Sequence, residues 1–356
     1  MQILHVITTV DRGGAEKQLV TLVAEQIKHG DKASIVYLKG RGELKSEFAA
    51  LKVKVVGSRH TWISALKLFR EIIRSKPDII HAHLPAAEIF SALFHGKIPL
   101  VVSRHNTQRF LESSIKFSRW IARYVESQAK LCIAISQAVR DYLIDVSEWG
   151  NRKTIRVVLY AIPGNFSKPR ARKNHRGKIR FLFVGRLTFQ KDVETLLFAF
   201  SKNLMKYNSD ILTIIGDGDL AQHLKALARR IGLESHVVWL GKVEDVDAYY
   251  QTHDVLVLPS KYEGFGLVLL EAIKNELPII AANNSAIPEV LGSEHPGLFQ
   301  TSNVEALAHL LHSSHSSIFH QASLNIQNSR LPLFEPSKMN YSIRETYLEA
   351  INANVL

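Results

Sequence analysis

The sequence predicts an α/β protein built from two doubly wound parallel-sheet domains. Apolar runs of strand length alternate with helical patterns along the chain, which is typical of parallel sheets covered by helices. The chain has 356 residues, more than a single hydrophobic core usually accommodates. Residues 167–177 are strongly basic and lack large apolar side chains. We therefore expect a first domain at 1–165, a linker at 166–178, a second domain at 179–335 and a last helix within 336–356.

The first domain is expected to start with a strand at residues 1–8. This strand runs into a turn with paired glycines at 11–16 and then into an apolar-periodic helix. Two further apolar strands, at 77–83 and 100–106, end in histidines. Residues 132–140 are expected to form the strand and serine-capped helix that close the domain.

The second domain is expected to repeat the same alternation of strands and helices. Apolar runs predict strands at 179–185, at 211–216, where an Asp-Gly turn follows, and at 237–243. Two more runs, at 254–259 and 278–283, predict the remaining strands of this sheet.

The segment 263–271 is the most informative part of the sequence. It follows the buried strand expected at 254–259 and forms a glycine-flanked turn that opens a helix. Gly264 and Gly266 let the backbone approach a ligand closely, and a helix start offers unpaired N–H groups. Glu263 precedes this helix and Glu271 lies on it, at the kind of strand end where open α/β sheets bind ligands. An ordinary surface turn before an amphipathic helix would show the same spacing, so the other motifs must decide.

Segment 263–271 resembles the Glu-x7-Glu motif of retaining glycosyltransferases with the GT-B fold, in particular family 4 of nucleotide-sugar-dependent enzymes. The resemblance covers nearly the whole chain and implies two Rossmann-like domains that face each other across a cleft. It implies that Glu263 reaches the transferred sugar and that Glu271 binds the ribose hydroxyls, whose two donors suit a carboxylate. It also implies a last helix that returns to the first domain. The backbone that holds sugar hydroxyls in the family corresponds here to Gly264, Phe265, Gly266 and Leu267.

A second match follows the strand expected at 179–185. The family carries a Gly-Arg-Leu and, about five residues on, a lysine, and both cations grip the donor diphosphate; here they correspond to Arg186 and Lys191. Two cations would stabilise the negative charge that grows on a departing nucleoside diphosphate, so no metal or other cofactor is expected. Where the family usually has glycine after the lysine, this chain has Asp192, which is expected to change the loop or to cap the next helix.

Three further positions are carried over by the resemblance. Gly13 and Gly14 correspond to the glycine loop of the family's acceptor domain and would leave room for the diphosphate. The strand and loop around Val243 would meet the nucleotide base through the backbone. The family's hinge usually reads Asn-Gly-Val/Ile-Asp, whereas this chain has Tyr-Ala-Ile-Pro-Gly at 160–164, which leaves the hinge geometry open.

The histidines that end two strands allow more than one interpretation. His81 and His83 share one face of their strand and, with His105, could bind a metal. No carboxylate accompanies them at ligand spacing, so no metal site is expected. His83 could equally be a buried histidine whose hydrogen bonds are satisfied by the protein. The resemblance places His105 near the reacting sugar carbon and phosphate, as a catalytic residue beside Glu263, Arg186 and Lys191.

Charge is distributed unevenly along the chain, whose net charge is +12. Residues 1–165 contain 25 lysines and arginines against 14 acidic residues, and residues 181–356 contain 13 against 19. Residues 109–125 combine apolar side chains with four cations in an amphipathic pattern. Such a helix either packs on the core with a solvated basic face or lies on an anionic membrane surface. The excess charge favours membrane contact or an acceptor that bears phosphates.

The compartment is expected to be the cytoplasm. The chain start lacks the pattern of a signal peptide, and no apolar run approaches the roughly 20 residues of a spanning helix. Its single cysteine, Cys132, excludes a disulfide within the chain and fits a reducing environment. Membrane association, where it occurs, is expected to be peripheral and on the cytosolic face.

Together these observations predict a retaining glycosyltransferase. It would move a hexose-type sugar from a UDP- or GDP-type donor to a glycan or lipid-linked acceptor, for example in bacterial surface polysaccharide or lipopolysaccharide synthesis. The alternatives are a nucleotide-sugar epimerase or a phosphorylase of the same fold. A basic nucleic-acid-binding protein is disfavoured, because the chain lacks basic runs interleaved with aromatic residues.

Overall fold

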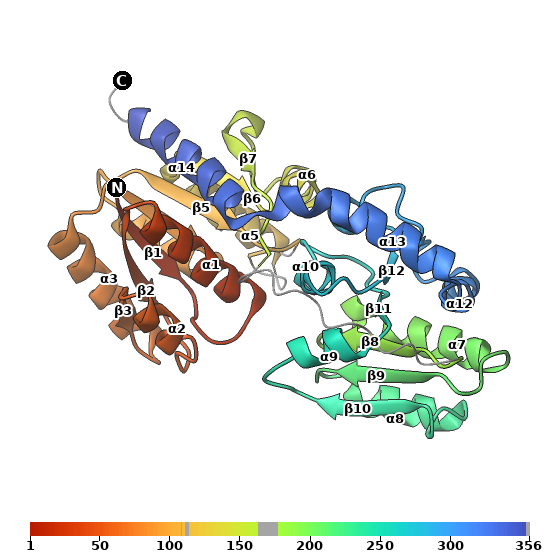
Figure 1. The fold of residues 1–356 in the computed structure, drawn as a ribbon. Helices are drawn as coiled ribbons and strands as arrows, with labels where there is room; N and C mark the ends of the chain where they lie inside the picture. Colours follow the sequence, from red (N-terminus) through yellow and green to blue (C-terminus); the bar gives the residue numbers. More distant parts are fainter. Residues whose placement is uncertain (108, 111–113, 163–176, 354–356) are drawn as a thin grey trace. The chain divides into compact units, whose positions relative to one another are not determined.

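The computed structural model describes residues 1–107, 109–110, 114–162 and 177–353 (Figure 1). The chain divides into two compact units, one formed by Met1–Gly164 with Leu333–Leu356 and the other by Asn165–Pro332. Each unit contains its own parallel sheet, which confirms the predicted fold class of two doubly wound α/β domains. Most of the predicted linker, at 166–176, and the end of the hinge segment, at 163–164, lie outside the described residues.

The first unit is built on a seven-stranded parallel sheet with the order β3-β2-β1-β4-β5-β6-β7. Its strands are β1 Gln2–Ile7, β2 Lys32–Tyr37, β3 Lys54–Gly57, β4 Ile79–His83, β5 Leu100–Arg104, β6 Leu131–Ala134 and β7 Ile155–Val157. β4 therefore lies at the centre of the sheet.

Two layers of helices cover this sheet. α1 and α14 pack against each other, and α14 also reaches β5, whereas α4 packs between α3 and α5. Right-handed crossovers place the helices before and after β4 on the face opposite α1. Serine side chains cap two of the helices, since Ser114 accepts from the N–H of Phe117 and Ser136 from that of Val139. The helices are α1 Gly14–Lys28, α2 Lys45–Ala50, α3 Thr61–Ser75, α4 Pro85–Phe94, α5 Ile115–Gln128, α6 Gln137–Asp145, η1 Arg152–Thr154 and α14 Pro336–Asn352, with η3 Leu331–Phe334 leading into α14.

The second unit contains a six-stranded parallel sheet with the order β10-β9-β8-β11-β12-β13. Its strands are β8 Arg180–Val184, β9 Ile211–Ile215, β10 Val237–Gly241, β11 Val255–Leu258, β12 Ile279–Ala282 and β13 Leu298–Phe299. Its helices are η2 Phe189–Lys191, α7 Val193–Leu204, α8 Ala221–Arg230, α9 Asp247–Thr252, α10 Leu267–Lys274, α11 Ile287–Leu291, α12 Val304–Ser313 and α13 Ser317–Arg330.

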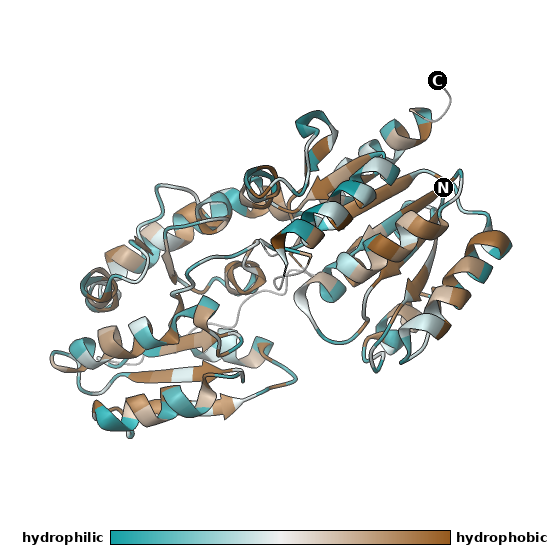
Figure 2. Ribbon diagram, turned by 180° about the vertical axis from the view of Figure 1, so that it is seen from behind, coloured by the Kyte–Doolittle hydropathy of each residue, from teal (hydrophilic) through white to brown (hydrophobic). Residues whose placement is uncertain are grey.

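The central strands are buried on both faces, as parallel sheets require. All four residues of β11 are buried, as are Phe181, Leu182 and Phe183 of β8. Figure 2 shows the visible strands mostly in brown, the colour of hydrophobic residues, whereas the helices carry both hydrophobic and hydrophilic residues. Continuous apolar runs therefore predict the strands of this chain better than alternating patterns do.

Each sheet has one point at which the strand order reverses. In the first unit the chain builds outward from β1 to β3 and then returns to β4, so the reversal lies between β1 and β4. In the second unit it lies between β8 and β11. Open α/β sheets bind ligands outside the carboxyl ends of the strands at this point. The loops that follow β1, β4, β8 and β11 are thus the expected ligand-binding loops.

Candidate functional site

In the second unit, the loops after β8 and β11 meet through a buried ion pair. The Lys191 Nζ atom lies 2.5 Å from the Glu263 Oε1 atom, and the two side chains are only 13% and 8% exposed. Lys191 ends the short helix η2, and Glu263 follows the end of β11 by five residues. A cation and a carboxylate that the sequence assigns to one donor therefore lie together at the point where the strand order reverses.

Backbone and side-chain bonds join the same two loops. The Gln190 side chain donates to the carbonyl of Tyr262, and the N–H of Lys261 donates to the carbonyl of Gln190. The N–H of Glu263 donates to the Ser285 hydroxyl at 2.8 Å. These bonds hold Lys191 and Glu263 on rigid supports, so their pairing follows from the loop geometry.

Arg186 lies on the same loop, directly after Gly185, and its side chain is exposed. The backbone here approaches the loop after β9 very closely, because a Cβ atom added to Gly216 would lie 1.9 Å from the Gly185 carbonyl oxygen. Gly216 also has a φ of +135°. Both the close approach and the positive φ therefore require glycine at position 216. The close approach fixes the backbone at Gly185, where the loop that carries Arg186 begins.

Asp192 departs from the family pattern in a position with a positive φ of 48°. Glycine adopts this conformation without strain, which explains why the family prefers it. Asp192 occupies the N-cap position of α7, but its side chain makes no bond to the backbone N–H groups of that helix. It accepts instead from the hydroxyls of Thr195 and Ser302. Asp192 therefore stands at the predicted cap position but does not cap the helix with its side chain, because its carboxylate accepts from the two hydroxyls instead.

Glu271 lies on α10, whose first residue Leu267 follows the left-handed Gly266. Its carboxylate is half-buried and accepts from the Tyr250 hydroxyl at 2.7 Å. Burial raises the pKa of Tyr250 well above its usual range, so this hydroxyl remains a donor. Tyr250 lies on α9, after the loop that carries Val243. No local pattern predicts its role, because its partner Glu271 lies 21 residues away.

In the first unit, the glycine loop after β1 folds around a buried carboxylate. Gly13 is extended, and a side chain there would meet the Glu16 carboxylate 2.3 Å away. Gly14 is the first residue of α1, and Thr9 donates to Glu16 at 3.0 Å. Burial raises the pKa of Glu16 above its usual value. Gly13 thus leaves room for the Glu16 carboxylate, a role that no local pattern in the sequence predicts.

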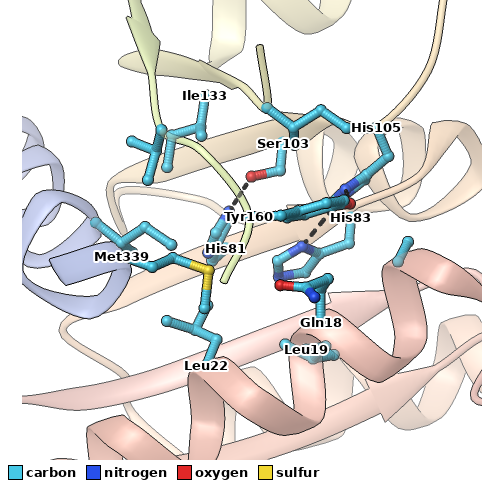
Figure 3. Close-up of a pocket in the computed structure, with 14 residues that line it drawn as sticks. Gln18, Leu19, Leu22, His81, His83, Ser103, His105, Ile133, Tyr160 and Met339 are labelled. Atoms are coloured by element: carbon cyan, nitrogen blue, oxygen red, sulfur yellow. Dashed lines mark hydrogen bonds between the residues drawn. The ribbon is translucent and has the colours of Figure 1, made fainter. Parts of the chain in front are cut away.

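The histidines predicted at the ends of β4 and β5 form a buried network (Figure 3). His83 Nδ1 lies 3.3 Å from His105 Nε2, and His83 Nε2 lies 3.1 Å from His5 Nδ1. His105 Nδ1 is bonded to the Tyr160 hydroxyl. Burial lowers the pKa of His105 to about 3 and that of His5 to about 4, so both rings are neutral near pH 7. His83 is therefore a buried histidine whose bonds the protein satisfies.

A metal could be considered at three of these rings. Ligand atoms of His5, His81 and His83 lie within 4.8 Å of one another, so the third ring is His5 and not the His105 that strand ends in the sequence indicated. His5 was missed because it faces His81 only through the pairing of β1 with β4. Both nitrogens of each ring already have protein partners, so a cation would displace a bond at every ligand.

A cavity of about 20 Å³ lies beside this network, lined among others by Gln18, Ser103 and Met339 (Figure 3). This volume holds about one water molecule and is too small for a sugar. The cavity is thus part of the packing around the histidines and is no donor pocket.

Two family models match the chain. The model described as Glycosyltransferase Family 4 matches residues 12–190, half of the chain. The model described as Glycosyl transferases group 1 matches residues 166–317. The two matches together span the paired glycines, the histidines of β4 and the loop after β5, the cations and both glutamates, whereas His5 lies before the matched residues.

Individual proteins show the same similarity over different lengths. An uncharacterized glycosyltransferase of Methanocaldococcus jannaschii is 38% identical over 120 residues, which cover 33% of this chain and 30% of that protein. A protein of Campylobacter jejuni is 28% identical over 318 residues, 84% of each chain; its name describes an N-acetyl-D-galactosaminyltransferase acting on an undecaprenol-linked glycan. The solved structure of Anabaena HepE in complex with UDP superposes with a TM-score of 0.79 at 21% identity, covering 97% of this chain and 99% of that one.

Proposed function

The chain belongs to glycosyltransferase family 4, and from this premise we propose that it transfers a hexose-type sugar from a nucleoside diphosphate sugar to a glycan or glycolipid acceptor. The observation that carries the proposal is the Lys191–Glu263 pair at the reversal point of the second sheet, beside Arg186. A buried pair of opposite charges at a ligand-binding edge suits a ligand that brings both an anion and hydroxyl donors. A nucleotide sugar brings both.

The pair suggests how the donor enters its site. Lys191 and Glu263 compensate each other's charge in this buried pair. A diphosphate would draw the Lys191 ammonium away and leave the Glu263 carboxylate to accept from sugar hydroxyls. Arg186 is exposed and would meet the same diphosphate from the start of the loop. Both cations would then stabilise the leaving group in the transition state, without a metal.

Transfer is proposed to retain the configuration of the sugar. The two carboxylates of segment 263–271 both have protein partners: Glu263 pairs with Lys191, and Glu271 accepts from Tyr250. Such partners suit carboxylates that bind the donor. Departure of the diphosphate and attack of the acceptor hydroxyl would occur on one face of the sugar, and the leaving phosphate oxygen would take the acceptor proton. His105 and Glu263 would position the sugar, Glu271 would bind the ribose, and the backbone at Val243 and at Gly264 to Leu267 would complete the donor site.

Ligand-induced thermal stabilisation tests the donor site. Purified protein is heated with UDP, GDP, ADP, CMP and their sugars, because a ligand that binds only the folded state raises the midpoint. One diphosphate should stabilise the wild type, while Arg186→Ala and Glu271→Ala should lose most of the shift. Arg230→Ala, at an exposed arginine that ends α8, is the matched control and should keep it. Equal shifts in all variants would contradict the assignment of the donor site. In a separate activity assay, product formed from the nucleotide sugar without any acceptor would favour an epimerase.

We also propose that the acceptor is lipid-linked and that the first unit binds an anionic membrane surface. α3, α4 and α5 pack side by side and expose large apolar side chains, including Trp62, 78% exposed on α3, and Trp120, 66% exposed on α5. Trp62 contacts Phe90 edge-on, and Phe117 stacks on Trp120. Cations accompany them on both outer helices, namely Lys67, Arg70, Arg74, Lys116, Arg119 and Arg123.

This surface extends the amphipathic segment predicted at 109–125, of which 111–113 lie outside the described residues. Ile121 and Val125 pack into the core, whereas Phe117 and Trp120 remain exposed, so α5 has a buried face and an exposed apolar face. Interfacial aromatic side chains together with cations favour an anionic bilayer surface. In the described part of the chain, no helix is both long and apolar enough to cross a membrane. The Campylobacter jejuni protein, whose named acceptor is undecaprenol-linked, supports a lipid-linked acceptor. A role in bacterial surface polysaccharide synthesis is part of the same proposal.

Vesicle co-sedimentation tests the membrane surface. The wild type should bind vesicles that contain an anionic lipid, less well in high salt and weakly to zwitterionic vesicles. The double variant Trp62→Ser/Trp120→Ser should lose most of this binding. Ile318→Ser is the matched control, because Ile318 is 79% exposed on α13 of the other unit. Binding that the two variants lose equally would contradict the proposed surface.

A further inference from the structure

A continuous chain of hydrogen bonds links α1 to the predicted catalytic histidine. It runs from Gln26 through His5 and His83 to His105 and ends at Tyr160. Gln26, His5 and His83 are buried and come from α1, β1 and β4, which are neighbours in the first unit. Four bonds thus connect side chains that lie far apart in the sequence.

The direction of these bonds follows from Gln26. Its amide oxygen is an acceptor only and lies 2.8 Å from His5 Nε2, so that nitrogen carries the proton. A neutral imidazole has one donor and one acceptor, so His5 Nδ1 must accept from His83 Nε2–H. By the same step His83 Nδ1 accepts from His105 Nε2–H. His105 Nδ1 is then the acceptor for the Tyr160 hydroxyl.

The amide nitrogen of Gln26 begins a second branch of hydrogen bonds, which leads to His81. This Nε2 atom of Gln26 donates to the Tyr347 hydroxyl at 3.4 Å, which leaves that hydroxyl to donate to His81 Nδ1 at 2.6 Å. His81 Nε2–H then donates to Ser103 at 2.7 Å. None of His5, His83 and His105 can change its tautomer alone, because two donors or two acceptors would then face each other. His81 is less constrained, because each of its two hydroxyl partners can donate or accept.

We propose that Gln26 is a positioning residue that fixes His105 as the Nε2–H tautomer through His5 and His83. The proposal rests on the proposed function only where it concerns turnover. His105 Nε2–H donates to His83, so Nδ1 is the nitrogen that a ligand can reach, in place of the Tyr160 hydroxyl. Because Nδ1 is an acceptor, His105 accepts from a hydroxyl of the sugar and does not donate to a phosphate oxygen. The tautomer thus assigns His105 to the sugar.

Nitrogen-15 NMR of histidine side chains tests the proposal in the wild-type protein. The two-bond couplings between ring protons and ring nitrogens distinguish Nε2–H from Nδ1–H, and single histidine variants assign the signals. At pH 7.5, His5, His83 and His105 should all be Nε2–H. An Nδ1–H tautomer or an imidazolium at His83 or His105 would overturn the proposal, whether or not the protein transfers sugar.

The variant Gln26→Leu tests the role of Gln26 itself. It removes the acceptor for His5, so the Nε2–H form of His105 should give way to a mixture with Nδ1–H. The donor-saturated turnover number should fall about tenfold, as expected for one lost hydrogen bond. Gln18→Leu is the matched control: Gln18 is also a buried glutamine on α1, but it bonds the backbone of Ala161. Gln18→Leu should keep the Nε2–H form, and equal tautomer changes in both variants would overturn the proposal.

Discussion

At the scale of single residues, the buried Lys191–Glu263 pair joins stability to donor binding. Each side chain compensates a charge that the other would otherwise leave in a largely dry site. A protein that needs the pair only for stability could replace both residues by apolar ones. Their presence at the reversal point of the sheet is therefore better explained by a ligand that separates them.

Lys191→Met should lower the free energy of unfolding by about 3–5 kcal/mol, because it strands the Glu263 carboxylate. It should also abolish stabilisation by the donor nucleotide. Urea unfolding followed by fluorescence measures the first effect. Lys202→Met is the control, since the Lys202–Glu305 pair is 44% and 74% exposed and should cost less than about 1 kcal/mol. Similar losses in the two variants would show that the Lys191 pair is an ordinary surface contact.

The buried histidines should make stability depend on pH. Their pKa values, about 4 for His5 and about 3 for His105, lie below the value of 6.5 for an unfolded histidine. Between pH 6.5 and pH 4 the unfolded chain therefore binds protons that the folded chain excludes. The free energy of unfolding should rise with pH across this window, by about 1.4 kcal/mol per pH unit for each such histidine. Glu88 opposes this trend, because burial raises its pKa to about 7.

Unfolding in urea at pH 7.5, 6.5 and 5.5 measures this dependence. His5→Gln should reduce the slope of the free energy of unfolding against pH by the contribution of one histidine, about 1.4 kcal/mol per pH unit, since glutamine does not titrate. A slope that the substitution leaves unchanged would mean that His5 is protonated in the folded state, which would also contradict the direction derived for its hydrogen bonds.

At the scale of elements, the close contact between the loops after β8 and β9 positions Arg186. Gly216→Ala should destabilise the second unit by about 3 kcal/mol or more, because the new Cβ would clash with the Gly185 carbonyl in addition to the strain of a positive φ. Gly232→Ala is the control: its φ is +77°, but nothing lies within 4 Å of the added Cβ. It should cost only about 1 kcal/mol. Thermal unfolding of both variants separates the clash from the strain, and equal losses would contradict the clash.

Elements were predicted well where the signal is local. The apolar runs at 179–185 and 254–259 became β8 and β11, and Ser136 caps the helix expected after Cys132. Side chains that act across the sheet left no such signal. His5 faces His81 only through strand pairing, and Tyr250 reaches Glu271 only after α9 and α10 have folded together. Such partners depend on register and packing, which a single sequence does not record.

At the scale of the whole molecule, two domains could be predicted from length and from the alternation of strands and helices. The order of the strands could not, because each apolar run fits any position in a parallel sheet. The structure also shows that the first unit is discontinuous in sequence, since Leu333–Leu356 belong to it. α14 supplies Tyr347, which bonds His81, and Met339, which lines the small cavity.

A chain that ends at Pro332 should therefore lose the first unit selectively. Without α14, the apolar faces of α1 and β5 are exposed to water, and His81 loses its hydroxyl partner. Hydrogen exchange should become fast in β1, β4 and β5 while β8 and β11 stay protected, because the second unit contains its whole sheet. Loss of protection in both sheets would show that the units depend on each other for stability.

The discontinuity of the first unit also sets an order of events during biosynthesis. The ribosome completes the second unit before it makes residues 333–356, so the Lys191–Glu263 pair can form while the histidines of β1 and β4 still lack Tyr347. The nascent chain would then possess its nucleotide-binding half before its other half closes. Until α14 emerges, water can reach His81 in place of the Tyr347 hydroxyl. Translation of the last helix would thus complete the His81 branch of the network, whose main branch takes its direction from Gln26 and His5.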